Sequence, residues 1–264
     1  MTIPIYQVDA FAAQVFEGNP AAVCVLEQWL EAGLMQQIAA ENNLSETAFF
    51  VPQGEGFHLR WFTPTTEVAL CGHATLAAAH VIFEHLAYPN TEIQFYTKSG
   101  LLSVKKEAEK LWLNFPESTL EKDFPSFQLI DAIGTEPLEV YRGGEDLLLV
   151  FESEKIVRDL KPNFAKMMQL PVRGLIATAL GEEYDFVSRF FGPAVGVNED
   201  PVTGSAHTSL IPYWAGRLGK KALQAKQIST RGGLLYCEQL AEKRVAIGGR
   251  AITYLIGQLF LPNL

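Results

Sequence analysis

Short apolar runs rich in aromatic and β-branched residues recur along the whole chain, separated by segments that contain Gly or Pro. Thr47–Val51 (TAFFV) and Phe57–Phe62 (FHLRWF) are typical of strands. Similar runs follow in both halves of the sequence: EIQFYT, LLSVKK, KLWLNF, LLLVF, GLIATAL, YDFVSRFF, GLLYCE and RVAIGG. The pattern predicts a protein built mainly from short strands.

Helical patterns interrupt the strands at a few places. Gln28–Asn42 carries Leu30, Leu34 and Ile38 at four-residue spacing, which predicts an amphipathic helix. The run Ala74–Ala79 consists mostly of small residues with high helix propensity. A helix with so little bulk can be closely surrounded on all sides.

The two halves of the chain share an ordered series of residues. Each half has an arginine four positions before a proline and then a glutamate five positions before a glycine: Arg60, Pro64, Glu67 and Gly72, then Arg189, Pro193, Glu199 and Gly204. Near-constant spacing of this kind predicts an internal duplication. We therefore expect two similar lobes, each with its own central helix, the second running from near Gly204 to about Leu218.

This organisation predicts an α+β protein with an N-terminal lobe over residues 1–116 and a C-terminal lobe over residues 117–264. The polar, proline-punctuated segment Pro116–Phe127 is the best candidate for a linker, and a last strand that crosses back to the first lobe is compatible with this division. We expect a cleft between the lobes in which both helix starts converge. Their unpaired N–H groups and helix dipoles would hold a carboxylate there without any Arg or Lys.

The composition narrows the class of protein. Hydrophobic residues make up 48% and charged residues 19% of the 264 residues, which is enough apolar material for a sizeable core. The net charge of −9 disfavours nucleic acid, and we expect no membrane segment and no signal peptide. Three cysteines without C-x-x-C spacing argue against a disulfide framework or a zinc site, so we expect a cytoplasmic, reduced protein.

Several motifs, in order, resemble those of the PhzF family of phenazine-biosynthesis-like isomerases, which share the diaminopimelate epimerase-like fold. They are VDAF, FEGNPAAV, NLSETAFF, RWFTPTTEVALCGHATLAAAH, LNFP, EDPVTGSAHTSL and STRGG, and they span essentially the whole chain. The resemblance implies a duplicated two-lobe fold, each lobe a mixed β-barrel around a central helix, and a homodimer. It also implies a cofactor-independent isomerase of a small carboxylate-bearing metabolite, which for the namesake is a dihydro-hydroxyanthranilate.

The resemblance assigns the general acid/base to Glu46 and the other catalytic positions to His73 and Asp200. Chemistry of this kind needs a carboxyl group that takes a proton from carbon and returns it elsewhere on the same substrate. The expected substrate-binding residues are Asn19, Ser45, Gly72, Gly204 and Ser205. Each catalytic assignment has a structural alternative: a solvated corner for Glu46, a partly buried core histidine for His73 and a cap or turn for Asp200.

Cys71 bears on the comparison with racemases of the same fold. Epimerases and proline racemases of this fold use two cysteines, one at each helix start, as opposed bases. Cys71 stands at the first helix start, whereas the second half reads DPVTGS and offers no cysteine. We therefore expect no two-thiol racemase and interpret Cys71 as a small buried side chain.

Two function classes stay open from the sequence. The first is a PhzF-like isomerase that uses Glu46 as its single base in the cleft between the lobes. The second is a noncatalytic protein that keeps the cleft and binds a metabolite or a partner. A nucleotide- or metal-dependent enzyme lacks its usual motifs here, so we expect neither a cofactor nor a metal.

Overall fold

The computed structural model describes residues 1–261, and within them the chain forms two compact units. Unit 1 comprises Met1–Asn114 and the segment from Gly248 onward, and unit 2 comprises Phe115–Ile247. The chain leaves unit 1 within strand β8 (Lys110–Pro116) and returns to it within strand β17 (Arg244–Gly249). The expectation of an α+β protein with many short strands and few helices is confirmed.

Unit 1 is built from most of the first half of the chain and its last strand. Its elements are β1 (Thr2–Ala10), β2 (Asn19–Val25), α1 (Ala32–Asn42), β3 (Glu46–Gln53), β4 (Gly56–Phe62), β5 (Glu67–Val68), α2 (Gly72–His85), β6 (Glu92–Thr97), β7 (Gly100–Glu107), β8 and β18 (Ala251–Phe260). The strands pair in the order β18–β1–β2–β3–β4–β6–β7–β8. The pairs β2–β3 and β4–β6 are parallel and the others are antiparallel.

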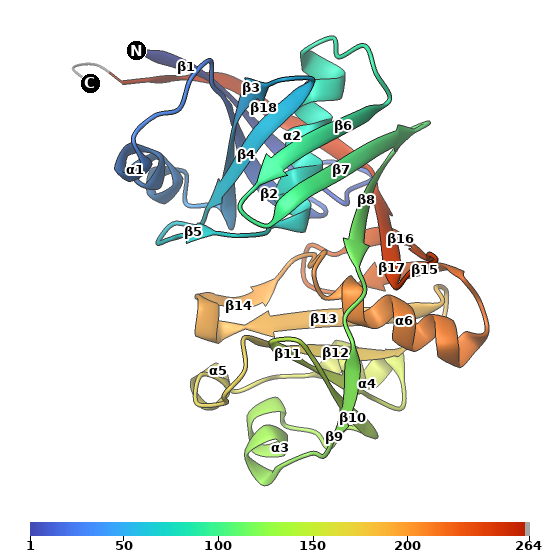
Figure 1. The fold of residues 1–264 in the computed structure, drawn as a ribbon. Coiled ribbons are helices and arrows are strands. Elements are labelled where there is room, and N and C mark those ends of the chain that lie inside the picture. The colour runs from blue at the N-terminus through green and yellow to red at the C-terminus, as the bar shows by residue number, and fades with distance from the viewer. Residues whose placement is uncertain (262–264) are drawn as a thin grey trace. The chain divides into compact units, whose positions relative to one another are not determined.

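The helix α2 is the centre of unit 1 (Figure 1). Every residue from Gly72 to Ala79 is buried, and the helix packs against β1, β2, β3 and β18. Small side chains make this enclosure possible, because strands can approach a helix closely only where little side-chain volume separates them. The prediction of a closely surrounded small-residue helix is confirmed.

Unit 2 repeats this plan. Its elements are β9 (Leu120–Asp123), α3 (Phe127–Ile133), β10 (Glu139–Gly143), β11 (Asp146–Val150), α4 (Glu154–Asp159), α5 (Phe164–Met167), β12 (Gly174–Leu180), β13 (Phe186–Gly192), the 3₁₀ turn η1 (Pro193–Val195), β14 (Val197–Asp200), α6 (His207–Leu218), β15 (Ala222–Gln227), β16 (Gly233–Gln239) and β17. The pairing order is β9–β10–β11–β12–β13–β15–β16, with β11–β12 and β13–β15 parallel. Six of the seven pairings given for unit 1 have a counterpart of the same direction and order in unit 2, so the predicted duplication is confirmed. In the described residues the sheet does not close into a complete barrel.

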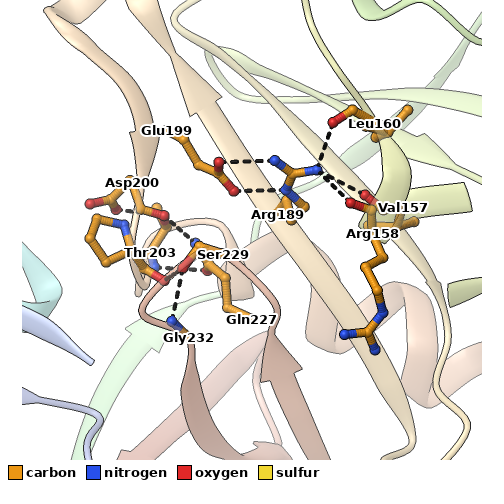
Figure 2. Close-up of polar contacts among 11 residues, drawn as sticks. Val157, Arg158, Leu160, Arg189, Glu199, Asp200, Thr203, Gln227, Ser229 and Gly232 are labelled. Carbon is orange, nitrogen blue, oxygen red and sulfur yellow. Dashed lines mark hydrogen bonds and ion pairs between the residues drawn. The ribbon is translucent and has the colours of Figure 1, made fainter. Parts of the chain in front are cut away.

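Equivalent ion pairs mark the repeat in atomic detail. Arg60 donates from Nε to Oε1 of Glu67 (2.7 Å) and from Nη2 to Oε2 (3.0 Å). Arg189 makes the same two bonds with Glu199, at 2.7 and 2.9 Å (Figure 2). Each pair joins two strands that follow one another in the chain, β4 with β5 and β13 with β14. The predicted correspondence of the two arginines and of the two glutamates is therefore confirmed.

Two of the predicted local boundaries are wrong. The amphipathic helix α1 begins at Ala32 rather than Gln28, because Glu31 still has extended backbone angles (φ −56°, ψ 137°). The expected linker Pro116–Phe127 instead contains strand β9, which pairs with β10 inside unit 2. Within residues 1–261, no helix is both long enough and apolar enough to cross a membrane.

The helix α6 begins three residues later than predicted and contains a proline. The N–H of His207 bonds the carbonyl of Gly204 (3.0 Å), a tighter pattern than that of an α-helix, so Gly204 lies in a turn before the helix. Pro212 has no N–H to offer the carbonyl of Thr208. That carbonyl accepts a hydrogen bond from the N–H of Ser118 instead (3.0 Å), which satisfies it within unit 2.

Candidate active site

Three polar side chains of unit 1 meet where β2, β3 and α2 begin. Glu46 is the first residue of β3, His73 the second residue of α2 and Asn19 the first residue of β2. His73 Nε2 lies 3.1 Å from Glu46 Oε2, and His73 Nδ1 lies 3.2 Å from Asn19 Nδ2. Two of the three predicted catalytic residues are therefore in direct contact, and a predicted binding residue touches one of them.

The buried contact between His73 Nε2 and Glu46 Oε2 is not a fully aligned hydrogen bond. The two atoms are within ion-pair distance, yet their geometry falls short of an aligned hydrogen bond. Burial disfavours a charged imidazole, but Cys71 and Glu46 outweigh it and raise the pKa of His73 well above its usual range. Nε2 is the ring nitrogen that faces Glu46, and an N–H at this position would point toward the carboxylate.

Cys71 completes this cluster from the residue before α2. Its Sγ lies 3.6 Å from His73 Nδ1. Burial, followed by the charge of Glu46, raises the pKa of the Cys71 thiol, which disfavours the nucleophilic thiolate form. One ligand atom from each of Glu46, Cys71 and His73 can be chosen so that all three lie within 4.8 Å of one another. Carboxylate oxygen, thiolate sulfur and imidazole nitrogen are ligand types that Zn²⁺ accepts, so this set could hold a metal ion.

The backbone beside the cluster comes from two further predicted residues. Ser45 directly precedes Glu46, and the buried Gly72 directly precedes His73 at the first position of α2. Both residues therefore border the polar cluster of unit 1.

In unit 2, the predicted site residues lie between β14 and α6. Asp200 ends β14, and Gly204 and Ser205 belong to the turn before α6. Thr203 donates from Oγ1 to Asp200 Oδ2 (2.5 Å), and the buried Gln227 donates from Nε2 to the Asp200 carbonyl (2.7 Å; Figure 2). The first bond holds the Asp200 carboxylate beside the turn, and the second holds the backbone of Asp200.

Sequence reasoning missed two residues of this region, Arg173 and Asp146. Arg173 donates from Nε to Asp146 Oδ1 (2.9 Å) and from Nη2 to the other carboxylate oxygen. Its Nη2 also donates to Ser205 Oγ at 3.2 Å. The sequence signal was an arginine directly before the strand-like run GLIATAL, and nothing in that local pattern connects it with Ser205.

The class of protein follows from this duplicated topology. The structure of a hydroxyproline epimerase from Agrobacterium vitis matches with a TM-score of 0.64 and 11% identity, covering 99% of this chain and 93% of that one. At this identity the likeness shows the fold alone. The chain therefore has the epimerase-like fold that was expected.

Closer relatives define the family. The PhzC-PhzF family, described as phenazine biosynthesis-like protein, matches residues 8–257. A PhzF-family structure from Enterococcus faecalis has a TM-score of 0.96 and 48% identity, covering 99% of this chain and 100% of that one. A Pseudomonas aeruginosa protein named an uncharacterized isomerase is 52% identical over 261 residues, which is 99% of this chain and 100% of the relative. The chain belongs to the PhzC-PhzF family, and the resemblance seen in the motifs is confirmed.

Proposed function

We propose that this protein is a cofactor-independent isomerase that moves a proton within a small carboxylate-bearing metabolite. The observation that carries the proposal is the direct contact between Glu46 and His73, with the Glu46 side chain 16% exposed and therefore reachable by a small molecule. Membership of the PhzC-PhzF family and the isomerase names of its relatives support the reaction class.

In the proposed reaction, Glu46 is the single carbon acid/base. Its carboxylate removes a proton from a substrate carbon while the electron pair moves into the adjoining unsaturated system, and the proton returns to another atom of the same molecule. His73 binds the substrate beside Glu46, and Asp200 contacts a polar substituent. The product is an isomer of the substrate, so the reaction consumes no oxidant, reductant or second substrate.

The remaining predicted residues are proposed to bind the substrate: Asn19, Ser45, Gly72, Gly204 and Ser205. The first three belong to the polar cluster of unit 1 and the last two to the turn before α6 in unit 2.

Proton exchange in deuterated water tests this function. A dihydro-hydroxyanthranilate and a panel of small cyclic amino and hydroxy acids are incubated with the protein, and NMR follows deuterium at carbon. We expect at least one compound to incorporate deuterium at a position that does not exchange without protein. A compound that raises the unfolding temperature but never exchanges would favour the alternative, a noncatalytic metabolite-binding protein.

We also propose that the protein is a homodimer. Apolar side chains on β18 and on the loop after β1 are unusually exposed: Phe16 67%, Tyr254 48%, Ile256 62% and Phe260 73%. Exposed apolar patches of this kind commonly mark protein interfaces. Light scattering should give twice the mass of one chain, and Ile256→Glu should shift the protein toward the mass of a single chain.

A further inference from the structure

Glu46, Cys71 and His73 bring three different kinds of metal ligand together inside unit 1. One ligand atom from each lies within 4.8 Å of the other two, and among residues 1–261 no other three His, Cys, Asp or Glu side chains form such a group. A thiolate is a soft ligand that favours Zn²⁺ and similar ions, whereas Mg²⁺ and Ca²⁺ prefer sites made of oxygen alone. The ligand types therefore point to a transition-metal ion of the zinc kind.

The spacing of these atoms is close to that of a tetrahedral zinc site. Zinc bonds of about 2.0–2.3 Å place neighbouring ligand atoms about 3.3–3.8 Å apart. His73 Nε2 lies 3.1 Å from Glu46 Oε2, and Cys71 Sγ lies 3.6 Å from His73 Nδ1. With one ring nitrogen of His73 as the ligand, every separation in the set is at most 4.8 Å. A shift of about 1 Å in one side chain therefore brings the set to zinc-site spacing.

The start of α2 holds two of the ligands in place. The carbonyl of Cys71 accepts hydrogen bonds from the backbone N–H (3.1 Å) and the hydroxyl (2.5 Å) of Thr75. His73 follows within the buried part of the helix, Gly72–Ala79. Ligands that are fixed beforehand lose little conformational freedom when they bind. The Glu46 side chain is 16% exposed, so it is the ligand that an ion from solution can reach first.

A zinc ion also suits the charges of this cluster. The contact of His73 Nε2 with Glu46 Oε2 is not a fully aligned hydrogen bond, so an ion that takes its place removes little stabilisation. Binding releases the thiol proton of Cys71 and any proton on the ligand nitrogen of His73. One thiolate and one carboxylate then balance the two charges of Zn²⁺, and a water molecule completes four ligands. Because the bound site has no net charge, the positive end of α2 does not oppose it.

We propose that Glu46, Cys71 and His73 bind one Zn²⁺ ion per chain and that this ion inhibits the protein. Zinc acts here as an inhibitor rather than a cofactor, because its bond to Glu46 occupies the carboxylate that has to accept a proton from the substrate. The inhibition rests on the proposed function, whereas the binding of the ion does not.

Titration of the whole, reduced protein with Co²⁺ tests the metal site, since a bond between cobalt and thiolate sulfur gives a charge-transfer absorption band. We expect the band to saturate at one Co²⁺ per chain and to disappear as Zn²⁺ displaces the cobalt, which also gives the Kd for Zn²⁺. Cys71→Ala should abolish the band. Glu46→Gln and His73→Gln should each weaken Zn²⁺ binding by at least about 100-fold, the upper end of the loss caused by removal of an outer-shell partner. Circular dichroism checks that each variant folds, and Cys71→Ser takes the place of a Cys71→Ala protein that does not.

Two control variants test the other groups of unit 1 that could bind the ion. Cys24 is a buried thiol in an apolar core cluster, so Cys24→Ala should keep the band. His80 and His85 both place Nε2 beside Oγ1 of Thr253, at 2.9 and 2.8 Å, and could bind a metal ion as a pair. That pair offers no thiolate, so His85→Gln should also keep the band and the affinity for Zn²⁺.

Deuterium exchange tests the inhibition. With a compound that exchanges a carbon-bound proton, saturating Zn²⁺ should abolish the exchange and EDTA should restore it. Mg²⁺ at the same concentration should leave the exchange unchanged, because the site contains a thiolate and an imidazole.

The metal site is overturned if wild-type protein gives no charge-transfer band or if the band persists in the folded Cys71 variant. Unchanged affinity for Zn²⁺ in folded Glu46→Gln or His73→Gln overturns it as well. Exchange that continues after the site is saturated with zinc overturns the inhibition. The binding measurements need no turnover. A protein that binds zinc at these residues but exchanges no carbon-bound proton would therefore refute the isomerase, and the inhibition with it, while the metal site stands.

Discussion

At the start of β3, unit 1 presents the carboxyl group of Glu46, whereas at the start of β12, unit 2 presents Gly174. The two positions correspond by register: Glu46 is paired with Ala21 across the parallel β2–β3 ladder, and Gly174 with Asp146 across the parallel β11–β12 ladder. Phe190 fills the space that a side chain at position 174 would need. Only unit 1 can therefore hold a base at this point of the repeat.

The acidic group of unit 2 stands instead on the neighbouring strand. Asp146 occupies the position of Ala21, and Arg173 pairs with it, so this carboxylate fixes a guanidinium rather than facing a histidine. The two units of a duplicated fold can therefore carry different functional groups at equivalent positions. The proposed base Glu46 belongs to unit 1, and the ion pair of Asp146 with Arg173 belongs to unit 2.

The helix starts differ in the same way. Cys71 directly precedes Gly72, and Thr203 directly precedes Gly204. The thiol of Cys71 lies beside His73, while the hydroxyl of Thr203 donates to Asp200. A hydroxyl already bonded to a carboxylate does not replace the second thiol of a two-base racemase, which agrees with a single-base mechanism in unit 1.

The largest expected effect comes from removing the base of unit 1. Glu46→Gln keeps the shape of the side chain but cannot accept a proton, so turnover should fall by at least 10²- to 10⁴-fold while ligand binding survives. Deuterium incorporation followed by NMR measures the loss. Glu55 is an exposed glutamate of the same unit, so Glu55→Gln is the control. This variant should catalyse deuterium exchange at the wild-type rate.

The second prediction compares the two equivalent arginines. Arg189 binds Glu199 and also donates to the carbonyls of Val157, Arg158 and Leu160 (Figure 2). Arg189→Met should lower the free energy of unfolding by about 3–5 kcal/mol, because it leaves a mostly buried carboxylate and three carbonyls without this partner.

Arg60→Met should cost less, about 1–3 kcal/mol, since Lys98 still pairs with Glu67 and Arg60 caps no carbonyl in the described residues. Urea denaturation of both variants measures the two losses in the free energy of unfolding. Equal losses, or a larger loss for Arg60→Met, would show that the carbonyl contacts of Arg189 do not distinguish the two units.

The third prediction concerns the pH dependence of unit 1. The hydrogen bonds from Arg60, helped by Lys98, lower the pKa of Glu67 from 4.5 to about 2. Because the folded state lowers this pKa, the stabilisation is complete above pH 4.5 and disappears as the pH falls toward 2. It amounts to at most about 3 kcal/mol. The free energy of unfolding of Glu67→Gln should therefore approach that of wild type as the pH falls from 5 to 2, and a constant difference would contradict this assignment.

The smallest effect is expected at Cys71. Cys71→Ser keeps a small polar group at the start of α2, and no partner thiol exists to complete a two-base exchange. The exchange rate should fall less than tenfold. Loss of activity in Cys71→Ser together with an active Glu46→Gln would reverse the assignment of the base.

Local patterns were enough to predict much of the fold. Apolar alternation located the strands of both units, and the spacing of Arg60 and Glu67 against Arg189 and Glu199 revealed the duplication before any contact was known. Both ion pairs join residues that are close in the chain, seven and ten positions apart. A repeat of such short-range contacts can be recognised from the spacing of the paired residues in the sequence.

The missed features depend on partners far away in the chain. The bond of Arg173 to Ser205 spans 32 residues, and β1 pairs with β18 from Thr2 against Phe260. The start of α6 shifted because a tight turn at Gly204 precedes the helix, which residue propensity alone does not reveal. Long-range pairing and turn geometry are fixed by packing, and packing is not visible in local periodicity.

The role of Glu46 as the single carbon acid/base is tested most directly by the rate of deuterium incorporation at low and at saturating substrate. Our account predicts that Glu46→Gln loses the rate at saturation, by 10²-fold or more, with KM nearly unchanged. A saturated rate that survives Glu46→Gln would contradict the account.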